Sequence, residues 1–275
     1  MVQDHRANKV ISSATGSLFE TKNIPLSISA FSKYVKDSVP SVRFLAIGYL
    51  SNLGNKSIEL LLRQSTLILL IQSTKDTDPT VSKLAWESIL TFNRSDFEGK
   101  PIDAMKKYTF NETNQLGLYA KTNGFLNLVD KTEALKNLLA TTISQSQKWQ
   151  VHLALAALGD KTSTDYVIEK AKKTPIDDNW ILSLAPDLAF TRSKPIYDLL
   201  FNIVLSNEKN CTSPNPDDNS KIPCAFSVLG NIASFIKSFP VQIDETGDIL
   251  GDYQKALKTS REWITKNRNT YTFNY

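Results

Sequence analysis

DSVPSVRFLA, residues 37–46, and DTDPTVSKLA, residues 76–85, repeat each other at a spacing of 39 residues. The two stretches share their Asp, Pro, Val, Leu and Ala positions, and hydroxyl residues match hydroxyl residues. In each stretch the proline follows polar residues that can cap a helix. Proline is favoured at the first helical position because its missing N–H would be unpaired there anyway. The repeat therefore predicts helices that begin at Pro40 and Pro79.

The residues after Pro40 complete one pair of antiparallel helices. Apolar residues follow the spacing of one helix face, at Val42, Leu45, Ala46, Leu50 and Leu53. We expect Gly54 to end this helix in the left-handed conformation. Residues 56–73 supply the return helix, and residues 75–78 form a polar turn. A period of about 40 residues with two helices per unit is typical of solenoid repeats, whose units bury their apolar faces against neighbours.

Further units are degenerate. The clearest repeats are residues 37–75 and 76–93, and weaker ones are predicted at 146–173, 178–206 and 222–268, followed by an extended tail at 269–275. The offset from the second unit to the third is 69 residues, which is not a multiple of 39. We therefore expect one domain over residues 1–275, with roughly six or seven helix pairs and irregular spacing.

The pattern Pro40, Val42, Arg43 and Ala46, followed by a long apolar helix, resembles the HEAT repeat in the broad sense that includes armadillo-like folds. The second unit departs from it, with Ser82 and Lys83 where the arginine would stand. The resemblance implies an all-α fold, a right-handed α-α superhelix. The second half of the chain is loosely similar to HEAT-like proteins that bacteria export.

Composition excludes little. The chain carries 32 Lys and Arg against 28 Asp and Glu, a net charge of +4, and its 41% hydrophobic content is that of a folded protein. Nucleic-acid binders concentrate basic residues on one face, and no such concentration is evident. The most apolar run, residues 57–73, is interrupted by Glu59 and Arg63 and is shorter than the about 20 apolar residues that span a bilayer.

No catalytic, cofactor or metal site emerges from the residue pattern. The only imidazoles are His5 and His152, and no P-loop, G-x-S-x-G or H-E-x-x-H pattern occurs. Two cysteines and one distant histidine do not make a zinc site. The acidic stretch with Asp244, Glu245, Asp248 and Asp252 lacks the ligand spacing of an EF-hand, so we expect it to favour the positive end of the last helix.

Five cations lie along the last predicted helix, at Lys255, Lys258, Arg261, Lys266 and Arg268. They form a candidate patch for an anionic partner, or they are solvated cations placed at the negative end of the helix dipole. In the tail after them, Tyr271, Phe273 and Tyr275 alternate with polar residues. We expect these aromatic residues to share one face and to cover the last helix pair.

Cys211 and Cys224 flank CTSPNPDDNSKIPC, a segment rich in turn-forming residues that predicts a surface loop. The cysteines either close this loop with a disulfide or remain two thiols. A bridge over a loop of this length would stabilise the fold by about 3 kcal/mol in the chain-entropy model, and it would place the protein outside the reducing cytosol. The start of the chain lacks the pattern of a secretion signal, so the protein is either cytoplasmic or an exported protein whose signal has been removed.

Two classes of function are compatible with these features. The favoured hypothesis is a non-enzymatic interaction protein whose helical surface binds a protein or peptide. The rival is a HEAT-like nucleic-acid-binding enzyme such as an alkylpurine DNA glycosylase, which the resemblance makes conceivable. Such an enzyme needs a strongly basic face with an acid and aromatic residues at its centre, whereas the Lys and Arg residues here are dispersed.

Overall fold

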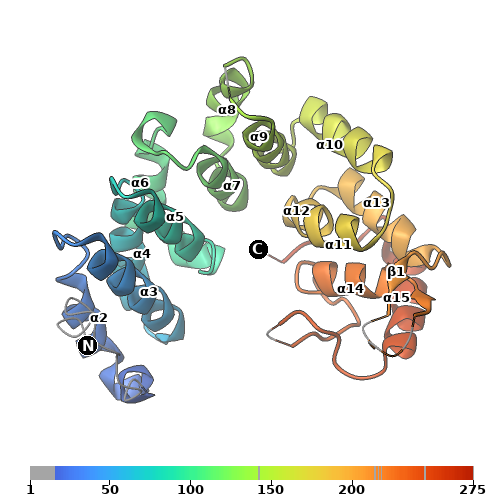
Figure 1. Ribbon diagram of the computed structural model, residues 1–275, viewed down its shortest axis with the longest axis horizontal. Coiled ribbons are helices and arrows are strands. Elements are labelled where there is room, and N and C mark those ends of the chain that lie inside the picture. Colours follow the sequence, from blue (N-terminus) through green and yellow to red (C-terminus); the bar gives the residue numbers. More distant parts are fainter. Residues whose placement is uncertain are drawn as a thin grey trace. The chain divides into compact units, whose positions relative to one another are not determined.

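The computed structural model describes residues 16–141, 143–213, 215, 217, 219–244 and 246–274. These residues are mainly helical (Figure 1), in agreement with the predicted all-α class. Contacts between residues divide the chain into two compact units, Met1–Gln150 and Val151–Tyr275, which are described separately below as unit 1 and unit 2. The expectation of a single domain over residues 1–275 stays a prediction.

Unit 1 alternates α-helices with short 3-10 helices. Its elements are η1 (Gly16–Phe19), η2 (Thr21–Asn23), α2 (Ile24–Ser32), α3 (Pro40–Lys56), α4 (Leu60–Ser73), α5 (Pro79–Ile89), η3 (Arg94–Phe97), α6 (Lys100–Lys107), η4 (Phe110–Glu112), α7 (Leu116–Leu126), η5 (Val129–Lys131), α8 (Thr132–Leu139) and the first half of α9 (Gln145–Ala157). Helices α3 and α5 begin at the two prolines, as the repeat predicts. The Asp78 carboxylate caps α5 by accepting hydrogen bonds from the N–H groups of Thr80 and Val81.

The prediction that Gly54 ends its helix is wrong. Helix α3 continues to Lys56, and Gly54 is buried within it. A Cβ atom at this position would lie 2.7 Å from the Phe92 ring and 2.8 Å from the Thr66 methyl group. Gly54 is therefore needed for close packing and not for a left-handed turn, and the return helix α4 begins only at Leu60.

Helices two apart in the chain pack side by side in unit 1. Helix α3 contacts both α4 and α5, α4 contacts α6, and α5 contacts α7. Figure 1 shows α3, α5 and α7 following one another along one side of the unit, with α4 and α6 along the other. The fully buried rings of Trp86, Tyr108 and Tyr119 fill the space between these helices.

Two arginines join successive helices by the same set of contacts. Arg43, in the first turn of α3, donates to the main-chain oxygen six residues back and makes a bidentate pair with Asp76, 33 residues on, at 2.6 and 2.7 Å. Arg63, in the first turn of α4, donates to the oxygen of Ser57 and pairs with Asp96, again 33 residues on, at 2.8 Å. Arg43 thus links the turns that precede α3 and α5, and Arg63 links the turn that precedes α4 to η3.

Unit 2 holds the second half of α9 and the elements α10 (Lys161–Lys173), α11 (Asp178–Ser183), α12 (Ala185–Phe190), α13 (Lys194–Leu205), β1 (Cys211–Thr212), β2 (Lys221–Ile222), α14 (Ala225–Ala233) and α15 (Tyr253–Asn267). Helix α13 is central, with contacts to α10, α12, α14 and α15. The segment predicted as one pair at 178–206 forms three helices. The pair predicted at 222–268, with a break around Pro240 to Gly247, forms as α14 and α15, and the described residues between these two helices are not helical.

The aromatic residues of the tail alternate with exposed ones, as predicted, but the tail packs mainly on α13, and it reaches the last predicted helix pair through the contact of Tyr271 with Trp263. Tyr271 and Phe273 are buried and the residues beside them are exposed. The Phe273 ring stands edge-on to Tyr197 at 4.7 Å, and Tyr271 packs on Phe201 at 5.2 Å. Backbone hydrogen bonds to the chain after α14 fix the tail in place. Tyr275 lies outside the described residues.

Candidate functional site

The cations predicted as a patch on the last helix divide between two faces of α15. The Arg261 guanidinium donates to the main-chain oxygens of Val204 and Ser206, and Arg268 pairs with Asp198 at 2.6 Å. Both arginines therefore bind α13 and serve the fold. The remaining members, Lys255, Lys258 and Lys266, are exposed. On a helix, the spacing of these lysines places the exposed Glu262 among them, which offsets part of their charge.

The acidic residues of the stretch after α14 play two different roles. Asp252 caps α15 by accepting from the Lys255 N–H at 2.8 Å, as expected. Asp244 instead closes its own tight turn, and the hydroxyl of Thr246 and the N–H of Asp248 lower the pKa of its carboxyl. Glu245 lies outside the described residues. Within the described part of the chain, no three His, Cys, Asp or Glu side chains come together as metal ligands would.

His152 joins α9 to α10. Its ring stacks on Tyr166 at a centroid distance of 3.9 Å, and its Nδ1 lies 3.1 Å from the hydroxyl of Ser163. Ser163 is itself buried in the first turn of α10, where its N–H donates to the Asp160 carboxylate. These contacts fit a packing role for His152. His5 lies outside the described residues.

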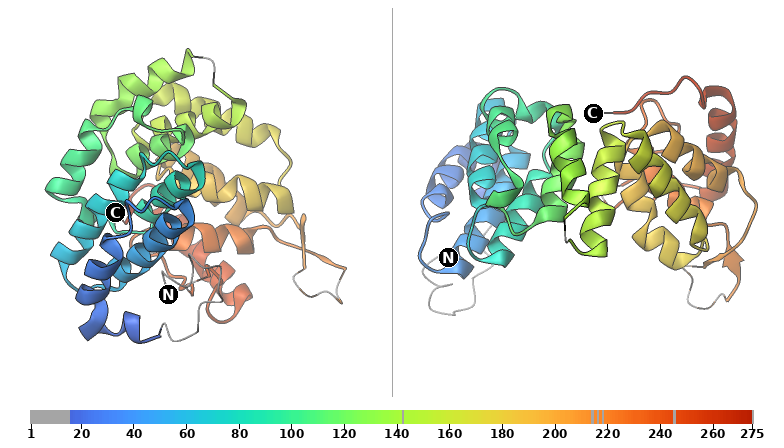
Figure 2. Two further views of the ribbon diagram at one scale, coloured as in Figure 1. Left: turned by 60° about the vertical axis from the view of Figure 1, so that its left-hand side comes forward. Right: turned by 90° about the horizontal axis from the view of Figure 1, so that it is seen from above.

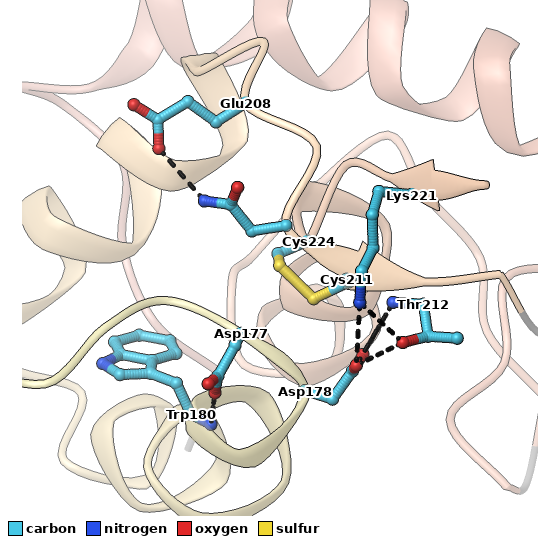
Figure 3. The surroundings of a disulfide bond; sticks show 9 residues. Asp177, Asp178, Trp180, Glu208, Cys211, Thr212, Lys221 and Cys224 are labelled. Carbon is cyan, nitrogen blue, oxygen red and sulfur yellow. Dashed lines mark hydrogen bonds and ion pairs between the residues drawn. A yellow bond between two sulfur atoms is a disulfide. The ribbon is translucent and has the colours of Figure 1, made fainter. Parts of the chain in front are cut away.

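The two cysteines form a disulfide, the first of the alternatives that the loop composition leaves open. The bond joins Cys211, at the start of a short hairpin, to Cys224, the residue that precedes α14 (Figure 3). The strands of the hairpin lie at the edge of unit 2 (Figure 2). Asp178 fastens it, because its carboxylate accepts from both the hydroxyl and the N–H of Thr212. These hydrogen bonds lower the pKa of the Asp178 carboxyl.

The surface feature that residue patterns did not reveal is a cleft in unit 1 between α5, α7 and α9, of about 310 Å³. We call it the amide-lysine cleft. Its polar lining consists of four primary amides and two lysines, namely Asn114, Gln115, Gln147, Gln150, Lys83 and Lys121. Leu116 and Leu118 supply its apolar surface. The described lining residues include no carboxylate and no aromatic side chain.

Local hydrogen bonds hold the walls of the amide-lysine cleft. The Gln115 amide donates to the main-chain oxygen of Pro79, and its N–H donates to the Thr113 hydroxyl. Gln147 closes a reciprocal cap with Ser144 at the start of α9, which fixes the other wall. The two walls approach closely at Gly117, where a Cβ atom would lie only 3.3 Å from the Cγ of Gln150.

This lining suits a polypeptide better than a nucleic acid. A primary amide offers both donors and an acceptor, which matches the alternating N–H and C=O groups of an extended main chain. Proteins bind single-stranded nucleic acid with aromatic side chains that stack on the bases and with a groove of positive charge that follows the phosphate backbone. Every arginine in the described residues already has a contact within the chain, at positions 43, 63, 94, 192, 261 and 268.

Searches of protein-family models, curated proteins and solved structures find no match to this chain. None of the helices in the described ranges is long and apolar enough to cross a membrane.

Proposed function

We propose that this chain is a HEAT-like helical-repeat protein, without catalytic activity of its own, that binds an extended polypeptide segment. The observation that carries the proposal is the amide-lysine cleft, formed by three alternate helices of unit 1. Lys121 and Lys83, which also pairs with Glu87 at 3.7 Å, line the cleft and favour segments with acidic side chains over basic ones. Peptide recognition of this kind needs positioned donors and acceptors and no reacting group.

The assignment to a HEAT-like superhelix is supported by the contacts that recur in unit 1. Stacking of alternate helices, prolines at the first positions of α3 and α5, and the two arginine bridges are features expected when similar units pack in register. In unit 2 the helix lengths are less regular. The proposal for the fold class therefore rests on unit 1.

The disulfide supports a place of action outside the reducing cytosol, in the periplasm or in the extracellular space. The cytoplasm is the alternative. Thiol titration of the unfolded, unreduced protein separates the two, because two reactive thiols in protein isolated from its native compartment would contradict an oxidising location.

The peptide-binding proposal is tested with random peptides displayed on phage and selected on the intact chain. Gly117→Phe places a ring in the amide-lysine cleft, and we expect it to weaken selected peptides about tenfold or more. Gly48→Phe is the matched control, because an added side chain meets open space at that position on α3.

Equal binding by both variants would contradict the proposal, as would a selection that yields no peptide sensitive to Gly117→Phe. Tight binding of a DNA duplex with a steep dependence on salt would favour the nucleic-acid alternative instead.

A further inference from the structure

A second cavity lies in unit 2, next to the disulfide, with a volume of about 210 Å³. Its apolar lining comes from Ile176, Leu199, Ile203 and Ala225, which belong to the segment before α11, to α13 and to the start of α14. Its polar lining includes Glu208 and Asn210, on the irregular segment that leads into the hairpin. We call it the disulfide pocket.

Among the described residues, Glu208 is the one charged side chain that lines the disulfide pocket. Its carboxylate accepts one long hydrogen bond, from the Asn210 amide at 3.4 Å, and makes no ion pair with any described residue (Figure 3). The arginines on α15 and at its C-cap have other partners: Arg268 binds Asp198 and Asn202, and Arg261 binds main-chain oxygens. The carboxylate thus retains most of its capacity to accept hydrogen bonds.

We propose that the disulfide pocket binds a primary alkylammonium group, such as the side chain of a lysine on a partner polypeptide. An alkylammonium has an apolar stem and a charged head, and such groups bury the stem while the head stays at a polar rim. Ile176, Leu199 and Ile203 provide apolar surface for the stem. Glu208 provides a charge-assisted hydrogen bond for the ammonium, the stronger kind of hydrogen bond in proteins.

The disulfide holds the wall that carries Glu208. Cys224 lines the pocket, and its bridge to Cys211 fixes the irregular segment that contains Asn210 and Glu208 against the start of α14. Asp178 holds β1, which follows this segment, through Thr212. Once the bridge is opened, the segment loses its covalent link to α14, and we expect the ammonium site to be lost. The disulfide pocket shares no lining residue with the amide-lysine cleft, so a result that contradicts one proposal leaves the other unaffected.

The test is an NMR titration of the full chain with n-butylammonium, with n-butanol as the uncharged control ligand. We expect saturable shifts of the Glu208, Asn210 and Ala225 amide signals, with a Kd of about 1 mM for so small a ligand. Glu208→Gln should weaken n-butylammonium about tenfold and leave the fold unchanged. Glu262→Gln, which removes an exposed carboxylate from α15, is the matched control and should bind as the unaltered chain does.

Three outcomes would overturn the proposal. They are n-butanol binding as tightly as n-butylammonium, Glu208→Gln binding unchanged, and shifts that map to other residues. The double variant Cys211→Ser, Cys224→Ser tests the disulfide. With helical circular dichroism retained, loss of binding supports its role, and unchanged binding contradicts it. Should that variant unfold, the Glu208→Gln comparison still decides the pocket.

Discussion

Unit 1 and unit 2 achieve stability by different means. In unit 1 the same contact recurs, with an arginine in the first turn of a helix bridging to an aspartate 33 residues later in both rows of helices. In unit 2 the main devices occur once each: a disulfide, an aromatic tail and the arginines of α15 that bind α13. Repeated polar contacts hold similar helix pairs in register. Contacts that occur only once instead fix segments of irregular structure.

The two strategies differ in what they contribute energetically. Forming an ion pair costs the solvation of both charges and gains their attraction, so the net contribution of the pair to stability is modest. Removing one partner costs more than this net contribution, because the other charge is left unpaired. Buried aromatic rings contribute the full removal of their surface from water, and each pair adds a little more through edge-to-face contact. Removing a buried ring from unit 2 should therefore cost more than exchanging Asp76 for Asn in unit 1, because the Asn amide still offers the Arg43 guanidinium a neutral hydrogen-bond acceptor.

The largest effect is expected for Phe273→Ala in the tail. This ring is 9% exposed and packs between Tyr197 and Tyr271. Its removal leaves a cavity that neighbouring rings cannot fill, so we expect unit 2 to lose about 3 kcal/mol of unfolding free energy. Native-state hydrogen exchange measures this loss separately for α13 and for α3, because each reports the opening of its own region.

The control for the tail is Phe44→Ala, the same substitution on α3. Phe44 is 42% exposed, so its truncation should change the protection of α3 only slightly. Equal losses for the two substitutions would show that burial of the tail does not stabilise unit 2. A loss of protection spread over α3 as well as α13 would show that the two units unfold together.

A smaller effect is expected for Asp76→Asn in unit 1. The Asp76 and Arg43 side chains are 9% and 11% exposed, and the substitution leaves a guanidinium with a neutral partner in place of its bidentate carboxylate. We expect the protection of α3 and α5 to fall by about 2 kcal/mol. Asp130→Asn, at an exposed acid of the same unit, should have no measurable effect, and a double-mutant cycle with Arg43→Gln isolates the pair.

How far a sequence predicts the fold depends on whether its signals are local. Pro40 and Pro79 mark helix starts because proline acts within one turn, and residues 146–173 form two helices as predicted. The role of Gly54 does not follow from its local sequence, because glycine serves both left-handed caps and close packing. Its contact with Phe92, which is distant in the sequence, distinguishes the two roles. The pattern of residues 178–206 predicts two helices where the structure has three, because tertiary packing sets such short helices.

The candidate sites were less predictable. The loop composition around Cys211 and Cys224 indicated a bridge, because both residues lie in one segment. The amide-lysine cleft draws its walls from three helices, and amides such as Gln115 and Gln150 carry no pattern of their own. The basic residues along the last helix are the opposite case, because their spacing predicts a surface patch to which the structure commits only some of them. Spacing along the helix alone did not reveal that Arg261 and Arg268 face α13.

The smallest expected difference between the units is their response to acid. Burial alone would raise the pKa of the Asp76 carboxyl, but hydrogen bonds from the Arg43 guanidinium and the Asp78 N–H outweigh it and lower that pKa. A carboxyl whose pKa is lower in the folded state stabilises the protein above its unfolded pKa of about 3.9. That stability is lost as the pH falls through the folded value. Unit 1 should therefore lose protection below about pH 4.

Asp178 offers the matched carboxyl in unit 2. Hydrogen bonds from Thr212 also lower its pKa, but its side chain is 47% exposed, so solvent screens the interaction and the stability at stake is smaller. Hydrogen exchange at pH 7 and at pH 3 tests this. Asp76→Asn should flatten the acid response of α3 and α5 more than Asp178→Asn flattens that of α11. Because Lys75 also lowers the pKa of Glu112, unit 1 should keep part of its response in Asp76→Asn. A full response in that variant would mean that the bridge between Arg43 and Asp76 contributes nothing to the acid stability of unit 1.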